Sequence, residues 1–140
     1  YQAIDKAVEI TQISGFRQRS LSELSGGEKQ RVFIAGAIAQ EAKMILFDEP
    51  TTFLDPQYAT ELVAIINKLR QEGICVIIAT HSINFALRIC KRIVALKEGY
   101  TVFDGNSEDF ATSEVLSRIY NNADFNIIKQ DSECYVFPKY

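Results

Sequence analysis

The sequence predicts an α/β fold with a parallel sheet at its core, flanking helices and a C-terminal hairpin region. Two short apolar runs, residues 44–47 and 74–79, have the length of buried parallel strands. Helical patterns alternate with these runs over residues 26–97, which favours parallel strands joined by helices. After residue 98 the pattern is that of an antiparallel or mixed region.

Composition narrows the class of protein. A chain of 140 residues can form one domain with its own core, and 47% hydrophobic with 24% charged residues is an ordinary globular balance. The net charge of −3 gives no electrostatic reason to expect a nucleic acid as the main partner. No apolar run approaches the roughly 20 residues of a membrane span, so any membrane role would need a partner protein.

The cysteines do not predict a metal site. Cys75, Cys90 and Cys134 lie in apolar stretches, form no CxxC pair and are accompanied by one histidine. A zinc site is therefore disfavoured, and we expect buried thiols in a reducing compartment.

The first half of the chain predicts two helices and a strand. Residues 1–13 carry apolar side chains at helical spacing, and residues 15–22 form a predicted loop. A helix is expected from near Gly26 to about Gln40, followed by the strand at residues 44–47.

A third long helix should connect the two strands. Asp55 suits an N-cap and Pro56 the first helical position, while Gly73 suits the helix end. The apolar face of this helix comprises Leu62, Ile65, Ile66 and Leu69. The second strand, residues 74–79, follows directly.

The remaining chain predicts short elements. Glu98-Gly99 is a hairpin signal between two strand-like runs. The expected elements are a short helix at residues 83–90, strands at 93–96 and 101–103, one or two short helices within 110–119, and a terminal hairpin of 126–129 with 134–137.

Ser25, Gly26 and Gly27 form the first candidate site. A serine before two glycines at a helix start presents free N–H groups, a hydroxyl and the positive end of the helix dipole, which together fit a phosphate. The glycines allow close approach of the backbone. The alternative is an ordinary serine-capped helix, which the motif alone leaves open.

Asp48 and Glu49 form the second candidate site. They follow the first strand at its carboxyl end, where α/β sheets place ligands. Asp48 suits Mg²⁺, and Glu49 could polarise a water for attack on a phosphoryl group. The alternative is a polar strand end closed by a turn at Pro50.

His81 follows the second strand and is the third candidate. It could contact a terminal phosphate or orient a water and a base. The alternative is a structural histidine at a helix start, whose ring nitrogens form hydrogen bonds with backbone groups.

The order of these motifs resembles that of the ABC ATPases. Residues 24–27 resemble the signature motif, residues 44–50 the Walker B strand, Phe53-Leu54-Asp55 the D-loop and His81 the H-loop. The resemblance extends from residue 1 to about residue 120 and implies part of a P-loop NTPase fold. It divides the chain into a helical subdomain (1–42), a catalytic α/β core (43–97) and a C-terminal hairpin region with short helices and a tail (98–140).

The resemblance also implies a role for each site residue. Glu49 would be the catalytic base, His81 the switch histidine and Asp48 the Mg²⁺ carboxylate. The ATP-binding set would comprise the signature residues, facing an ATP held by an opposing subunit, and one residue at the dimer interface: Ser25, Gly26, Gly27, Glu28 and Asp55.

Some positions depart from the commonest family pattern. Glu28 and Lys29 follow the signature glycines, and Ser82 follows the histidine where aspartate is usual. Gly36 replaces a usual arginine inside a helix, which costs up to about 1 kcal/mol or permits closer packing. None of these changes removes a reacting group.

The phosphate-binding P-loop is missing, because none of the seven glycines lies in GxxxxGK[ST]. We therefore expect a fragment that is inactive alone, and the lack of a starting Met is consistent with this. The N-terminus also shows no signal-peptide pattern. The strand at residues 74–79 would then lack a neighbour. It should pair with another chain or leave an exposed seam.

The tail and the D-loop indicate a subgroup within the ABC ATPases. Residues 113–120 and Phe53 resemble importers for iron–siderophore, haem or cobalamin. The implied protein is an importer ATPase on the cytoplasmic face of the inner membrane, with ATP and Mg²⁺ as cofactors. Its partners would be an N-terminal half with a P-loop, a second ATPase subunit and a permease. A DNA-repair or chromosome ABC ATPase and a non-catalytic ABC-derived module are the alternatives.

Overall fold

The computed structural model describes residues 1–52, 55–121, 123–131 and 133–139. The chain forms two compact units, Tyr1–Ala79 and Thr80–Tyr140. Within the described residues, no helix combines the length and the apolar character that crossing a bilayer requires.

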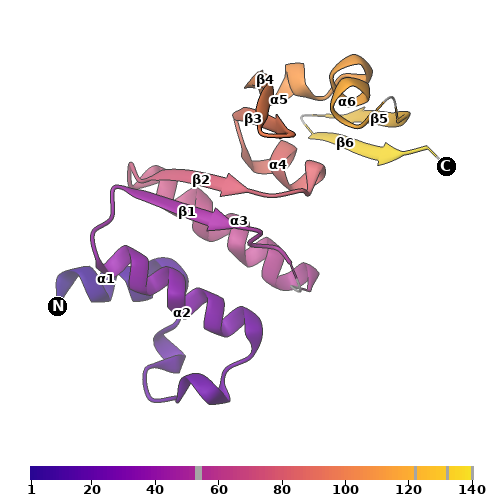
Figure 1. Ribbon diagram of the computed structural model, residues 1–140. Coiled ribbons are helices and arrows are strands. Elements are labelled where there is room, and N and C mark those ends of the chain that lie inside the picture. Colours follow the sequence, from indigo (N-terminus) through magenta and orange to yellow (C-terminus); the bar gives the residue numbers. More distant parts are fainter. Residues whose placement is uncertain (53–54, 122, 132, 140) are drawn as a thin grey trace. The chain divides into compact units, whose positions relative to one another are not determined.

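The first unit has a helical part and a small parallel sheet (Figure 1). Helix α1 packs against α2, and α3 lies against both α1 and β2. The predicted loop region contains two short 3₁₀ turns, and a local capping box of Ser20 and Glu23 closes the second one. The elements in order are α1 (Gln2–Thr11), η1 (Ser14–Phe16), η2 (Leu21–Glu23), α2 (Gly26–Ala39), β1 (Met44–Asp48), α3 (Pro56–Gln71) and β2 (Cys75–Ala79).

Helix α3 forms as its sequence signals predict. The Asp55 carboxylate accepts hydrogen bonds from the N–H groups of Gln57 and Tyr58 at 2.9 and 3.1 Å, and Pro56 opens the helix. Beyond its end, Gly73 has a φ of +76°. The predicted apolar stripe is buried, and it comprises Leu62, Ile65, Ile66 and Leu69.

Strands β1 and β2 pair in parallel, with Met44 opposite Cys75 and Asp48 opposite Ala79. The prediction of two buried strands holds only for one face of β1 and is wrong for β2, whose residues alternate between exposed and half-buried. Ile45 and Phe47 are buried, whereas Met44 and Leu46 are 56% and 66% exposed. The reason is that α3 lies along one face of the pair, and parallel strands are buried on both faces only where both are covered (Figure 1).

The predicted seam at β2 is confirmed. In the part of the chain that the structure describes, this sheet has two strands, so β2 is hydrogen-bonded along one edge only. Ile77 is 45% exposed on the uncovered face. The expectation of buried thiols is wrong for Cys75, which is exposed opposite Met44, while Cys90 and Cys134 are half-buried.

The second unit contains two antiparallel hairpins and three short helices, as the tail pattern predicts. Its core comprises Ile93, Phe110, Leu116 and Val136. Glu98 and Gly99 both have positive φ, which suits a tight hairpin turn. The elements are α4 (Ile83–Ile89), β3 (Arg92–Lys97), β4 (Tyr100–Asn106), α5 (Ser107–Phe110), α6 (Ser113–Ile119), β5 (Phe125–Gln130) and β6 (Glu133–Pro138).

Gly36 permits a direct test of helix propensity. It lies inside α2, is exposed, and no described atom outside the helix's own nearby backbone lies within 4 Å of a Cβ built there. The closer packing considered from the sequence is therefore not observed among these residues. Gly36→Ala should raise the free energy of unfolding by about 0.5–1 kcal/mol, measured by urea denaturation.

The matched control is Gly73→Ala. Gly73 also has open space around it, but its φ of +76° is unfavourable for alanine, so this variant should lower the free energy of unfolding by about 1–2 kcal/mol. A loss of stability in Gly36→Ala would contradict the prediction.

Candidate functional site

The first turn of α2 is closed by a capping box. Ser25 Oγ accepts a hydrogen bond from the Glu28 N–H at 3.3 Å, and Glu28 Oε2 accepts one from the Ser25 N–H at 2.8 Å. Among the described residues, the N–H groups of Gly26 and Gly27 have no hydrogen-bond acceptor. The serine-capped helix is thus present, and the two glycine N–H groups are the donors that it leaves for an anion.

Glu28 is held as a carboxylate by this arrangement. The hydrogen bond from the Ser25 backbone lowers the pKa of Glu28 below its ordinary value, and the Ser25 side chain, Arg19 and Arg31 contribute in the same direction. Its negative charge at the N-terminus of α2 also complements the helix dipole.

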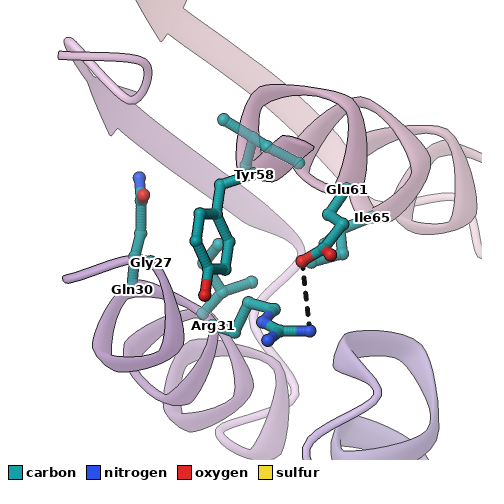
Figure 2. A pocket seen from close by; sticks show the side chains of 8 residues that line it. Gly27, Gln30, Arg31, Tyr58, Glu61 and Ile65 are labelled. Atoms are coloured by element: carbon teal, nitrogen blue, oxygen red, sulfur yellow. Dashed lines mark ion pairs between the residues drawn. The ribbon is translucent and has the colours of Figure 1, made fainter. Parts of the chain in front are cut away.

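Tyr58, in the first turn of α3, packs against the glycine turn (Figure 2). A Cβ placed on Gly27 would lie 2.5 Å from Cδ1 of the Tyr58 ring, so the ring occupies the space that a side chain would need. The Tyr58 hydroxyl lies 3.3 Å from Ser25 Oγ. Gly27 is buried, whereas Gly26 is exposed with open space around it.

The two candidate carboxylates lie at the end of β1. Asp48 is its last residue and is exposed. Glu49 leaves the strand with a φ of +43°, a left-handed conformation that costs a non-glycine residue about 1–2 kcal/mol. Its N–H donates to the carbonyl oxygen of Ala79 at 2.8 Å, and its own carbonyl accepts from the Thr52 N–H at 3.1 Å.

Helix α2 is tied directly to this turn. Gln30 Nε2 donates a 2.8 Å hydrogen bond to the carbonyl oxygen of Pro50. The first unit therefore brings together the Ser25–Gly27 turn, the Asp48–Glu49 turn and the N-terminus of α3. Asp55 takes part as the cap of that helix, while Phe53 and Leu54 lie outside the described residues.

His81 belongs to the second unit. It is exposed and precedes α4, and the Ser82 N–H donates to Thr80 Oγ1 at 3.1 Å in a tight turn around it. Ser82 occupies the N-cap position of α4 but makes no capping hydrogen bond with its side chain.

The chemistry of these residues fits a nucleotide phosphate and Mg²⁺. The free N–H groups of Gly26 and Gly27 suit phosphate oxygens. No group of three acidic, histidine or cysteine side chains converges among the described residues. Mg²⁺ at Asp48 would therefore need phosphate and water oxygens as further ligands, which is its usual arrangement in proteins.

Sequence reasoning missed the residues that join the motifs. Tyr58 and Thr80 belong to no motif, and Gln30 gave no sign that it reaches Pro50. None of the three was singled out from the sequence, although Tyr58 is a large aromatic residue in the first turn of the helix that Asp55 caps.

The sequence model described as "ABC transporter" matches residues 1–52. The chain is 34% identical over 99% of its length to the petrobactin import ATP-binding protein FpuC of Bacillus anthracis, covering 51% of that protein. It is 45% identical over 76% of its length to the phosphonates import ATP-binding protein PhnC of Escherichia coli, covering 41% of it. The chain thus spans about half the length of these curated relatives.

Among solved structures, the chain is similar to a putative metal-chelate type ABC transporter in an inward-facing conformation. The TM-score is 0.84 at 26% sequence identity, with 100% of this chain and 57% of the other covered.

The two signature glycines should differ in their tolerance of a side chain. Gly27→Ala brings a methyl group against the Tyr58 ring and should lower the free energy of unfolding by about 1–3 kcal/mol, as overpacking does. Gly26→Ala, the matched control, meets open space and should not lower it. Equal stability of the two variants, measured by urea denaturation, would contradict the packing described for Tyr58.

The capping box should give α2 a pH-dependent stability. Because folding lowers the pKa of Glu28, its contribution is fully present above the unfolded value of about 4.3 and is lost as pH falls through the lower folded value. Glu28→Gln removes this titration. The difference in unfolding free energy between wild type and Glu28→Gln should therefore shrink below about pH 4. A difference that stays constant with pH would exclude this role.

Proposed function

Because the chain belongs to the ABC transporter ATP-binding family, we propose that it supplies the catalytic carboxylates and the signature motif of an importer ATPase. The observation that carries the proposal is the Glu49 turn. Glu49 is held in a strained left-handed conformation directly after Asp48, and hydrogen bonds from both sides of the turn fix it. Left-handed φ values also occur at turns such as that of Glu41, so it is the combination with the strand-end position after Asp48 that supports a functional role.

In the proposed reaction, ATP and Mg²⁺ supply the phosphoryl group and the neutralising charge. Glu49 orients the attacking water and accepts its proton as the water oxygen bonds to the terminal phosphorus and the bond from that phosphorus to ADP breaks, and Asp48 would hold the metal. His81 contacts the terminal phosphate or helps to orient the water. Ser25, Gly26 and Gly27 donate hydrogen bonds to an ATP bound by a second subunit, and Asp55 lies at that subunit interface.

The missing P-loop defines the first partner. We infer that the phosphates are cradled by a P-loop segment outside these 140 residues and that the chain is inactive without it. A second ATPase subunit would complete the site, and a permease would couple hydrolysis to transport. The assembled protein would lie on the cytoplasmic face of the inner membrane.

The transported solute can be proposed only as a broad class. The relatives are named for petrobactin and for phosphonates, so similarity alone selects neither. The resemblance of residues 113–120, which lie in and just after α6, favours an iron complex or a similar solute.

The alternative of a DNA-repair or chromosome ABC ATPase receives no support from the structure. Among the described residues no long coiled coil is present, and the chain passes directly from α2, which ends at Ala39, to β1, which begins at Met44. The alternative of a non-catalytic module is tested by the experiment below.

Glu49→Gln is the decisive variant. In the protein that joins these residues to a P-loop segment, it should lower ATP turnover roughly 10²- to 10⁴-fold, because glutamine keeps the shape but cannot accept the proton. Steady-state phosphate release measures this. Unchanged turnover would exclude Glu49 as the base and favour the non-catalytic module.

The matched control is Glu41→Gln. Glu41 is another glutamate with a positive φ, +55°, but it is exposed, follows α2 and lies in none of the motifs, whereas Glu49 is half-buried. Its variant should turn over ATP like wild type.

Titration of the 140-residue chain alone with MgATP should give no tight binding, and submicromolar affinity would contradict the need for a P-loop segment.

A further inference from the structure

Tyr58 connects two motifs that are far apart in the sequence. Its backbone N–H is held by the Asp55 carboxylate at 3.1 Å, in the first turn of α3. Its side chain points to the first turn of α2, as Figure 2 shows. The residue thus joins the cap of α3 directly to Ser25 and Gly27.

The ring of Tyr58 is fixed on two sides. One side packs on the Gly27 backbone, which is possible only because Gly27 has no side chain. The guanidinium carbon of Arg31 lies 5.7 Å from the ring centroid, and Arg31 Nη1 forms a 3.2 Å ion pair with Glu61 Oε2 on α3. Arg31 thus contacts two residues of α3, Tyr58 and Glu61. The Tyr58 ring therefore has little freedom to rotate away from Gly27.

The hydroxyl of Tyr58 can set the direction of the Ser25 proton. Ser25 Oγ already accepts the Glu28 N–H and has one further acceptor position and one proton. When Tyr58 donates across the 3.3 Å contact, both acceptor positions are used and the Ser25 proton must point elsewhere. It is then available to an anion at the glycine N–H groups.

We propose that Tyr58 is a positioning residue for the signature motif. Its ring holds the Gly27 backbone, its hydroxyl orients Ser25, and its place in α3 couples both to Asp55. This inference rests on the proposed function, in which the Ser25–Gly27 turn binds the ATP of a second subunit. Tyr58 itself does not contact the nucleotide.

Two variants separate the ring from the hydroxyl. In the protein carrying the P-loop segment, Tyr58→Phe should lower kcat about threefold to tenfold, because one neutral hydrogen bond is lost. Tyr58→Leu should lower kcat more than tenfold, because the support of Gly27 is lost as well. KM for ATP should change less than twofold in both, since the P-loop segment provides the initial binding. Rates are expressed per folded subunit, so a merely unstable variant retains wild-type kcat.

A double variant tests the hydroxyl contact itself. If Tyr58 acts through Ser25, then Ser25→Ala/Tyr58→Phe should be no slower than Ser25→Ala alone. Multiplicative losses would overturn the proposal, as would wild-type kcat in both Tyr58 variants. If Tyr58→Leu does not fold, Tyr58→Phe and the double variant still decide. Thr60→Ala, at an exposed position of the same helix, is the control and should retain wild-type kcat.

The two proposals can fail separately. If Glu49→Gln abolishes turnover but the Tyr58 variants do not reduce it, only the Tyr58 proposal fails. If wild type does not hydrolyse ATP, the proposed function fails, and hydrogen exchange at the Glu28 amide then tests Tyr58 without nucleotide. That amide donates to Ser25 Oγ, and its exchange should be at least fivefold faster in Tyr58→Phe than in Thr60→Ala. Equal rates would overturn the positioning role.

Discussion

The packing of α3's first turn against α2's first turn is the constraint on which the candidate site depends. Tyr58 fills the space above Gly27, Arg31 lies against the ring, and Gln30 extends from the same helix to the carbonyl oxygen of Pro50. These contacts fix the glycine turn and the carboxylate turn relative to one another within the first unit. A helix start and a strand end that would otherwise be independent become one structural feature.

This arrangement gives the two motifs a physical reason to act together. The glycine turn presents free N–H groups, and the Glu49 turn stores backbone strain that its hydrogen bonds to Ala79 and Thr52 maintain. A shift of α2 would change both the donors for one phosphate and the position of a base for another. In the proposed dimer, one subunit could thereby respond at its carboxylates to an ATP bound at its signature motif.

Much of the fold could be predicted from local signals. The α3 helix follows from Asp55, Pro56 and an apolar stripe, and the parallel pair follows from two apolar runs with a helix between them. The burial of these strands could not be predicted, because burial depends on what covers each face rather than on the strand's own residues. Met44 and Cys75 are exposed for this reason. The site motifs were visible as candidates, but Tyr58 was not, because no periodic pattern specifies a contact between side chains 33 positions apart, such as those of Ser25 and Tyr58.

The sequence by itself determined which chemical groups this protein carries and their order along the chain: a serine-capped glycine turn, two strand-end acids and a histidine after the second strand. Only the tertiary structure decided how they are supported. The backbone of Glu49, with its left-handed φ, is held by a hydrogen bond to the distant carbonyl oxygen of Ala79, and Gly27 is confined by a ring from another helix. Propensities and motifs report interactions between neighbours in sequence, whereas these constraints arise only when separate elements pack together.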